Sequence, residues 1–310
     1  MKIIFFGSDD FAAVHLEQIL ACGHQVLGCV TSVDKPQGRG MKLGSSPIKK
    51  MALEHNLPCL QPASLTSKAV VQTLRIYQAD IFVVVAFGRL LTQEILDIPK
   101  IFCVNVHASL LPKYRGAAPI NWAILNDERE TGVTVQKMAL ALDAGDIIAQ
   151  ERVAVLDDEN AAQLRERLSQ LGARLLVRVL DQCSSGQYVL KPQKEDQVSY
   201  ASKLTRQMGE IDWAKPARRI FNQVRGLQPW PVAYTFYNGK MLKILQGTTT
   251  TEDTAKDIPG QVISLDKNGF VVAAGDRGFL IKEVQPEAGR VMSAVSFAAG
   301  YKIIPGCKLG

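Results

Sequence analysis

The sequence predicts an α/β protein in which a parallel sheet is followed by a small antiparallel β-domain. Three observations support this: a strand–helix–strand opening, a central run of branched apolar residues, and a last third of short apolar runs between turn signals. The length of 310 residues suggests two domains, at roughly 100–200 residues each. We therefore expect one domain over 1–190, a linker over 191–208 and a second domain over 209–310.

The opening pattern is a βαβ unit. Ile3–Phe6 is a short apolar strand, and Asp9 or Asp10 can cap a helix over Phe11–Ala21. Gln25–Val30 then supplies the second strand. Two strands joined through a helix in this way favour parallel pairing.

A valine-rich run marks the centre of the sheet. Ala79–Phe87 is almost continuously apolar, as is typical of a parallel strand buried on both faces. Further strands are expected at Ile101–Val106, Gly132–Lys137 and Ile147–Val155. Leucines at helical spacing predict a long helix over Glu159–Gln182.

The last third changes character. Residues 191–203 are polar and lack periodicity, which predicts the linker, and Pro216–Leu227 is expected to be a helix. Beyond Val232, short apolar runs alternate with turn signals such as Asn238-Gly239. This pattern predicts a small antiparallel β-barrel.

Charge is distributed unevenly along the chain. Residues 1–190 hold 19 basic and 19 acidic side chains, whereas residues 191–310 hold 17 and 11, so the whole net charge of +6 lies in the second part. Such asymmetry indicates a polyanionic partner such as nucleic acid, although a charge that serves solubility fits equally well on this number alone. Eight basic side chains precede the predicted barrel and are expected to meet phosphates rather than bases: Lys191, Lys194, Lys203, Arg206, Lys215, Arg218, Arg219 and Arg225.

Several protein classes are excluded by what the sequence lacks. The longest apolar run is Ile81–Phe87, far short of the roughly 20 residues of a membrane span. The six cysteines form no C-x-x-C pair, which favours reduced thiols and a cytoplasmic location. The opening loop has only Gly7 of the three glycines of a dinucleotide-binding loop. No metal motif is present, so no metal is expected.

The candidate catalytic residues are Asn105, His107 and Asp143. Asn105 and His107 are two apart at a strand end, so their side chains share a face, and Asp143 lies in a tight turn. A carboxamide and an imidazole suit acyl transfer, and a carboxylate can orient the imidazole. An Asn-x-His pair alone favours the structural alternative, a cap at His107 and a turn former at Asp143. No nucleophile stands out, so an amine of the substrate is expected to attack a bound acyl donor.

The surrounding motifs identify a family. Asn105–Ile120, Thr131–Val135 and Leu142–Asp146 resemble the 10-formyltetrahydrofolate-dependent formyltransferases. The resemblance implies a Rossmann-like domain and transfer of a formyl group from 10-formyltetrahydrofolate, as co-substrate, to an amine. It also implies catalysis by Asn105, His107 and Asp143, and folate binding by Ser109, Leu110, Leu111, Pro112, Phe87, Gly88 and Leu90.

The last third narrows the resemblance to members of the family that formylate a charged tRNA. Asn222–Pro231 is similar to the signature that opens their C-terminal domain, and the 33–42 loop is similar to the insertion that grips a tRNA acceptor end. The resemblance implies an initiator methionyl-tRNA partner and an OB-like barrel. A monomer is expected because no strong amphipathic interface stands out in the sequence. The residues expected to bind tRNA are Lys35, Arg39, Lys42, Lys203 and Arg206.

Two alternatives remain open at this point. One is a formyltransferase that acts on an amino sugar nucleotide, which would share Asn105, His107 and Asp143 without needing the Arg39 loop or a basic C-terminal domain. The other is a non-catalytic RNA-binding protein with a barrel, and the intact set of three candidate catalytic residues disfavours it.

Overall fold

The structure, a computed structural model, describes residues 1–37 and 42–310. The chain forms two compact units. Unit 1 consists of residues 1–119, 130–154 and 165–202, and unit 2 consists of residues 120–129, 155–164 and 203–310.

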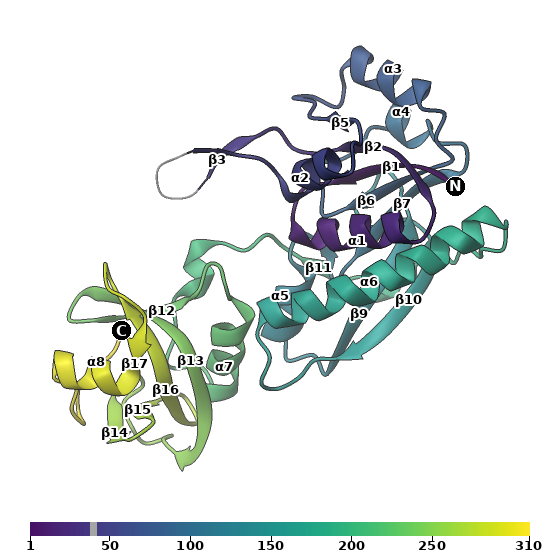
Figure 1. Ribbon diagram of the computed structural model, residues 1–310. Helices are drawn as coiled ribbons and strands as arrows, with labels where there is room; N and C mark the ends of the chain where they lie inside the picture. Colours follow the sequence, from purple (N-terminus) through teal and green to yellow (C-terminus); the bar gives the residue numbers. More distant parts are fainter. Residues whose placement is uncertain (38–41) are drawn as a thin grey trace. The chain divides into compact units, whose positions relative to one another are not determined.

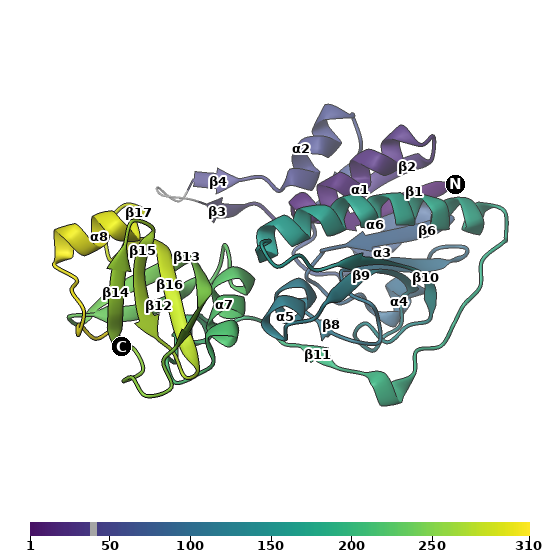
Figure 2. The ribbon, with the colours of Figure 1, turned by 90° about the horizontal axis from the view of Figure 1, so that it is seen from below.

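Unit 1 is built on a seven-stranded sheet with the order β10-β9-β7-β6-β1-β2-β5 (Figures 1 and 2). The pairs β1–β2, β1–β6, β6–β7 and β2–β5 are parallel, while β7–β9 and β9–β10 are antiparallel. The strands are β1 (Lys2–Gly7), β2 (Gln25–Val30), β3 (Lys35–Gln37), β4 (Lys42–Gly44), β5 (Cys59–Leu60), β6 (Ile81–Val85), β7 (Phe102–His107), β8 (Arg115–Gly116), β9 (Glu130–Lys137), β10 (Ile147–Ala154) and β11 (Tyr200–Ala201).

The predicted Rossmann-like α/β fold is confirmed, with one refinement at the edge of the sheet. The sheet is mixed because β9 runs antiparallel to β7, and β10 runs antiparallel to β9. The second pairing follows from the short connection over residues 138–146, since parallel pairing needs a crossover of about a dozen residues or more. The strands expected from the sequence are present, and their ends differ by a few residues.

Helices cover both faces of the sheet in unit 1. Asp9 caps α1, with its carboxylate accepting from Ala12 N at 3.1 Å, as predicted. Both views place α1 and α6 on one face and α3 and α4 on the other (Figures 1 and 2). The helices are α1 (Asp10–Ala21), α2 (Pro47–Glu54), α3 (Lys68–Ile76), α4 (Gln93–Leu96), α5 (Pro119–Leu125), α6 (Ala161–Ser184) and the 3₁₀ turn η1 (Glu195–Gln197). The division between the units falls within α5 and α6.

Unit 2 is the predicted antiparallel β-domain. Its hydrogen-bonded strand order is β12-β13-β16-β15-β14, with β17 paired to β16, and three register shifts between β13 and β16 interrupt the regular ladder. Trp213, Phe270, Phe279 and Phe297 lie in its core. The elements are η2 (Arg206–Gly209), α7 (Ala217–Gly226), β12 (Ala233–Tyr237), β13 (Lys240–Asp253), β14 (Val262–Asp266), β15 (Gly269–Ala273), β16 (Arg277–Pro286), β17 (Met292–Ser293) and α8 (Ala294–Tyr301).

Two α-helices, α7 and α8, precede and follow the strands of this domain in the sequence. The predicted helix at Pro216–Leu227 is α7, whereas α8 falls in a stretch where the sequence predicted only strands and turns. Ser293 caps α8 by accepting from Ser296 N at 3.1 Å. Among the described helices, none has the length and apolar character needed to cross a bilayer.

The first turns of α7 explain why residues 120–129 and 155–164 belong to unit 2. Arg218 donates to both Asp127, at 2.7 Å, and Asp157, at 2.6 Å. Arg219 donates to Leu125 O at 2.9 Å. The guanidinium of Arg218 lowers the pKa of both carboxyl groups through these hydrogen bonds.

Candidate active site

The end of strand β7 brings the first two candidate residues to one face of the sheet. Asn105 and His107 alternate with Val106, so their side chains point the same way. In the antiparallel pairing with β9, Asn105 lies opposite Gln136 and His107 opposite Thr134. No hydrogen bond joins the Asn105 carboxamide to another described side chain or backbone group.

His107 is held on both sides of its ring. Its Nε2 lies 2.8 Å from the carbonyl oxygen of Tyr114, and its Nδ1 lies 3.6 Å from Asp143 Oδ2. A carbonyl oxygen can only accept, so Nε2 carries a hydrogen and donates it to Tyr114. The nitrogen left for proton transfer is therefore Nδ1, beside the carboxylate. The side chains of His107 and Asp143 are only 7% and 11% exposed.

Asp143 is fixed by two hydrogen bonds and by its turn. The N–H of Gly116 donates to Oδ2 at 2.9 Å, and Gln136 Nε2 donates to Oδ1 at 3.2 Å. The φ of Asp143 is +51°, in the left-handed region, where Asp and Asn are better tolerated than most residues. Two residues later, a Cβ on Gly145 would lie 1.7 Å from Lys137 O, so this tight turn requires a glycine.

The structure therefore brings together the three candidate catalytic side chains. His107 and Asp143 are close, and Gln136 links the Asp143 carboxylate to the strand position opposite Asn105. A carboxamide donor, an imidazole with one free nitrogen and a carboxylate in one place can stabilise an oxyanion and move a proton.

The stretch from Ser109 to Pro112 is a tightly bonded loop. The Ser109 hydroxyl is buried and donates to Lys113 O at 2.6 Å. Leu111 is buried, its N–H donates to the Thr134 hydroxyl at 3.1 Å, and its carbonyl accepts from Gln150 at 2.8 Å. Leu110 and Pro112 are half-buried. These bonds use the polar groups of Ser109 and Leu111 to shape the loop after β7.

The loop after β6 holds the other candidate folate residues. Phe87 is buried and packs edge-to-face on Phe6, with ring centroids 5.5 Å apart. Gly88 has a φ of +69°, and Leu90 is exposed. Arg89 closes the loop by donating to Pro62 O at 2.7 Å and Ala63 O at 3.0 Å. The Phe87 side chain thus belongs to the core, whereas Leu90 is available at the surface.

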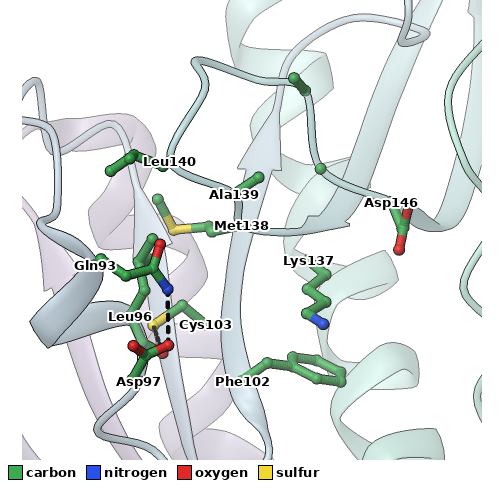
Figure 3. Close-up of a pocket in the computed structure, with 12 residues that line it drawn as sticks. Gln93, Leu96, Asp97, Phe102, Cys103, Lys137, Met138, Ala139, Leu140 and Asp146 are labelled. Atoms are coloured by element: carbon green, nitrogen blue, oxygen red, sulfur yellow. Dashed lines mark hydrogen bonds between the residues drawn. The ribbon is translucent and has the colours of Figure 1, made fainter.

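A cavity of about 370 Å³ lies beside the Asp143 turn (Figure 3). Figure 3 shows Gln93 and Leu96 of α4, and Asp97 just after this helix, near Met138, with Lys137 and Asp146 farther along the wall. Gln93 Nε2 donates to Asp97 Oδ1 at 2.8 Å. The cavity is lined by Gln93, Leu96, Asp97, Phe102, Cys103, Lys137, Met138, Ala139, Leu140, Ala144, Gly145 and Asp146.

The candidate tRNA-binding residues fall in both units. Lys35 begins β3 and Lys42 begins β4, two short paired strands, while Arg39 lies outside the described residues. Lys203 and Arg206 are exposed in unit 2, and Arg206 begins η2.

Fewer of the eight basic side chains before the predicted barrel are free to contact a phosphate than the sequence suggests. Arg225 is buried and donates to Leu156 O at 2.8 Å and Glu159 O at 3.2 Å, and burial lowers its pKa. Arg218 and Arg219 are also bonded within unit 2. Arg225 therefore cannot serve as a free phosphate contact.

Sequence reasoning missed the polar residues that support the candidate catalytic set. Thr134 and Gln136 are buried polar residues two apart in strand β9, and this spacing, which places both on one face of the strand, was the available signal. Gln193 contacts the Asp143 turn from a segment without periodicity, which offers no such signal. In residues 1–37 and 42–310, no group of three or more His, Cys, Asp or Glu side chains is placed to hold a metal ion.

Comparison with known proteins places this geometry in a family. A family model described as "Formyl transferase" matches residues 1–180, and one described as "Formyl transferase, C-terminal domain" matches residues 203–302. A solved N-formyltransferase from Helicobacter canadensis, in complex with folinic acid and dTDP-3-aminofucose, has a similar fold. Its TM-score is 0.67 at 21% identity, over 93% of this chain and 100% of that chain.

Relatives with higher identity match from end to end. The methionyl-tRNA formyltransferase of Moorella thermoacetica is 43% identical over 310 residues, which cover 100% of this chain and 99% of the relative. That of Geobacter sulfurreducens is 41% identical, over 100% of this chain and 97% of the relative. The chain therefore belongs to the formyl transferase family, in its methionyl-tRNA formyltransferase branch.

Proposed function

We propose that this protein transfers the formyl group of 10-formyltetrahydrofolate to the α-amino group of methionine on charged initiator tRNA, producing formylmethionyl-tRNA for translation initiation. The observation that carries the proposal is the match to methionyl-tRNA formyltransferases along the whole chain, second domain included. The arrangement of Asn105, His107 and Asp143 supplies the chemistry that this reaction needs.

The reaction forms one carbon–nitrogen bond and breaks another. The neutral amine attacks the formyl carbon, negative charge develops on the formyl oxygen, and the bond to the folate nitrogen then breaks. The Asn105 amide N–H and a protonated His107 Nδ1 would stabilise that oxygen, each donor contributing on the order of 10²–10³ in rate.

Asp143 would transfer the proton of the attacking amine. Its carboxylate is 3.6 Å from His107 Nδ1, and it is held by Gly116 and Gln136 on the remaining sides. Through a water molecule it would accept the proton that the attacking amine loses and pass it to the leaving folate nitrogen. The hydrogen bond to Tyr114 O keeps His107 Nε2 out of this transfer.

The cavity beside the Asp143 turn is the proposed site for the pterin ring. Leu96 and Met138 offer apolar surface to the ring faces, while Gln93 and Asp97 offer polar groups to its edge. Leu90 lies on the loop that leads into α4, so it would contact the folate outside this cavity. Ser109 to Pro112 would act mainly by shaping the loop that holds His107 in place.

The tRNA would be bound through its phosphates. Lys203 and Arg206 are exposed in unit 2, and Lys35, Arg39 and Lys42 belong to the loop that resembles an acceptor-end insertion. Contacts of this kind position the RNA without reading its sequence. They would hold the charged 3′ end of the tRNA while the methionine amine reaches His107 and Asn105.

A formyl-transfer assay tests the proposal. Purified protein, 10-formyltetrahydrofolate and charged initiator tRNA should give formylmethionyl-tRNA, whereas an amino sugar nucleotide offered in place of the tRNA should remain unformylated. Rapid formylation of the sugar amine with none of the tRNA would assign the alternative substrate.

A further inference from the structure

One side chain outside the three candidate catalytic residues holds the backbone of the Asp143 turn. Gln193 Nε2 donates to the carbonyl oxygens of Asp143 and Gly145, both at 2.7 Å. Its Oε1 accepts from Arg115 Nε at 3.1 Å. The residue is half-buried and lies in unit 1, in the polar segment where the sequence predicted a linker.

The orientation of the Gln193 amide is determined by its partners. The two carbonyl oxygens can only accept, so the group that faces them must be the NH₂. The same NH₂ also donates to Gln136 Oε1, at the longer distance of 3.3 Å. The guanidinium of Arg115 can only donate, so the group that faces it must be the carbonyl. The Gln193 side chain thus bridges the Asp143 turn, which supplies hydrogen-bond acceptors, and Arg115, which supplies donors.

Arg115, which donates to the Gln193 carbonyl, is itself held in place. It is only 4% exposed and donates to Glu195 Oε1 at 2.8 Å. Backbone hydrogen bonds fix the segment that carries Gln193 at both of its ends. Lys191 exchanges two backbone hydrogen bonds with Ile147, at 2.8 and 2.9 Å, and Ser199 O accepts from Arg115 N at 2.9 Å.

The neighbours of Arg115 contact the candidate catalytic pair directly. Tyr114 O accepts from His107 Nε2, and Gly116 N donates to Asp143 Oδ2. One short stretch of chain therefore sets the His107 ring, the Asp143 carboxylate and, through Gln193, the backbone that carries Asp143.

We propose that Gln193 is a positioning residue for formyl transfer, which acts through Asp143. By holding the carbonyl groups on both sides of the turn, it fixes the Asp143 carboxylate at its place beside His107 Nδ1. It does not touch the reacting atoms. The inference rests on the proposed function and assigns to a residue outside the candidate catalytic set a specific part in it.

The test is Gln193→Glu, with Gln197→Glu as the matched control. The variant keeps the size of the side chain and its acceptor for Arg115, but it cannot donate to the two carbonyl oxygens. Gln197 is exposed in the same segment, and its side chain bonds to no described residue. Since a displacement of about 1 Å can cost roughly 100-fold in rate, we expect kcat to fall about 10- to 100-fold. The KM for each substrate should stay within about twofold, and the control should match the wild type.

A second comparison separates positioning from general support of the fold. Gln193→Met removes the hydrogen bonds without adding charge, and both substitutions are repeated in an Asp143→Asn background. If Gln193 acts through Asp143, the Gln193 substitution lowers kcat by less than about threefold there. An equal loss in both backgrounds, KM changes as large as the kcat change, or full activity of the two single variants would each overturn the proposal.

The outcome stays separate from that of the proposed function. If the wild-type protein fails to formylate charged tRNA, the proposed function is wrong. If the wild type is active and the two Gln193 variants are equally active, only the positioning role is wrong.

Discussion

The carbonyl oxygen of Tyr114 accepts a hydrogen bond from His107 Nε2 at 2.8 Å, and this bond decides which nitrogen of the imidazole can react. With Nε2 committed to the backbone, only Nδ1 is available, and Nδ1 is the nitrogen that faces Asp143. Tyr114 itself has a φ of +63°, so a residue in the left-handed region places the carbonyl at this position. The geometry of the loop after β7 thus bears directly on the chemistry proposed for His107.

The first prediction concerns the Asp143 carboxylate. Asp143→Asn should fold normally, because asparagine also tolerates a φ of +51° and keeps an acceptor for Gly116 N. It loses the negative charge and the ability to accept a proton, so we expect kcat to fall on the order of 10²–10⁴-fold. Steady-state kinetics and a thermal melt would measure both effects.

Asp158→Asn is the control for this prediction, since Asp158 is an exposed carboxylate in unit 2. Near-normal turnover of Asp143→Asn would remove Asp143 from the mechanism.

The second prediction concerns the turn itself. Gly145→Ala would place a Cβ 1.7 Å from the backbone oxygen of Lys137, so the chain must move. We expect a destabilisation of about 1–3 kcal/mol and a loss of kcat, because Asp143 lies two residues earlier in the same turn. Chemical denaturation and kinetics check the two parts. Gly300→Ala is the control, as its Cβ would meet nothing within 4 Å; unchanged kinetics for Gly145→Ala would show that the turn can adapt.

Part of this site follows from the sequence and part depends on tertiary packing. The strand period places Asn105 and His107 on one face, and Leu142–Asp146 is recognisable as a turn. The approach of Asp143 to His107 is different, because 36 positions separate the two residues in the sequence. Their contact depends on the pairing of β7 with β9, which leaves no local pattern, and on the close approach of the Gly145 turn to Lys137 O, which the turn signal alone does not reveal.

The same reasoning applies to the rest of the fold. Long periodic segments such as α6 and the buried strand β6 are predictable because burial imposes their pattern. α8 was missed because it has only eight residues, few enough for its apolar positions to fit a strand as well as a helix. The Arg225 charge was assigned to the surface because composition alone does not reveal that backbone carbonyls surround it.

The third prediction tests phosphate binding by unit 2. Replacing Lys203 and Arg206 together with alanine should weaken tRNA binding and reduce the slope of log affinity against log salt by about 1.4–1.8, since each phosphate contact contributes roughly 0.7–0.9. The KM for 10-formyltetrahydrofolate should not change. Binding measured by filter retention or anisotropy over a salt series gives the slope.

The control removes the same charge elsewhere in unit 2. Lys256 and Lys267 are both exposed, and their double alanine variant should keep the wild-type slope. Equal slopes for the two double variants would mean that overall charge, rather than contact at Lys203 and Arg206, governs tRNA binding.

The last prediction concerns acid stability and a buried histidine outside the candidate catalytic set. Burial lowers the pKa of His15 from 6.5 to about 4, although the ring keeps a hydrogen bond to Phe11 O at 2.7 Å. Between these two values the unfolded chain binds a proton at His15 and the folded chain does not, so stability falls as the pH falls from 6.5 to about 4. The loss attributable to His15 is on the order of 3 kcal/mol.

His15→Gln tests this, because glutamine is neutral at every pH and can still donate to Phe11 O. Free energies of unfolding measured by denaturation from pH 7 to pH 4 should fall less steeply for this variant than for the wild type. His55→Gln, at an exposed site, should follow the wild-type curve. Should His15→Gln show the wild-type slope, the acid sensitivity arises from the carboxylates instead, of which Asp127, Asp157 and Asp80 are paired with basic side chains.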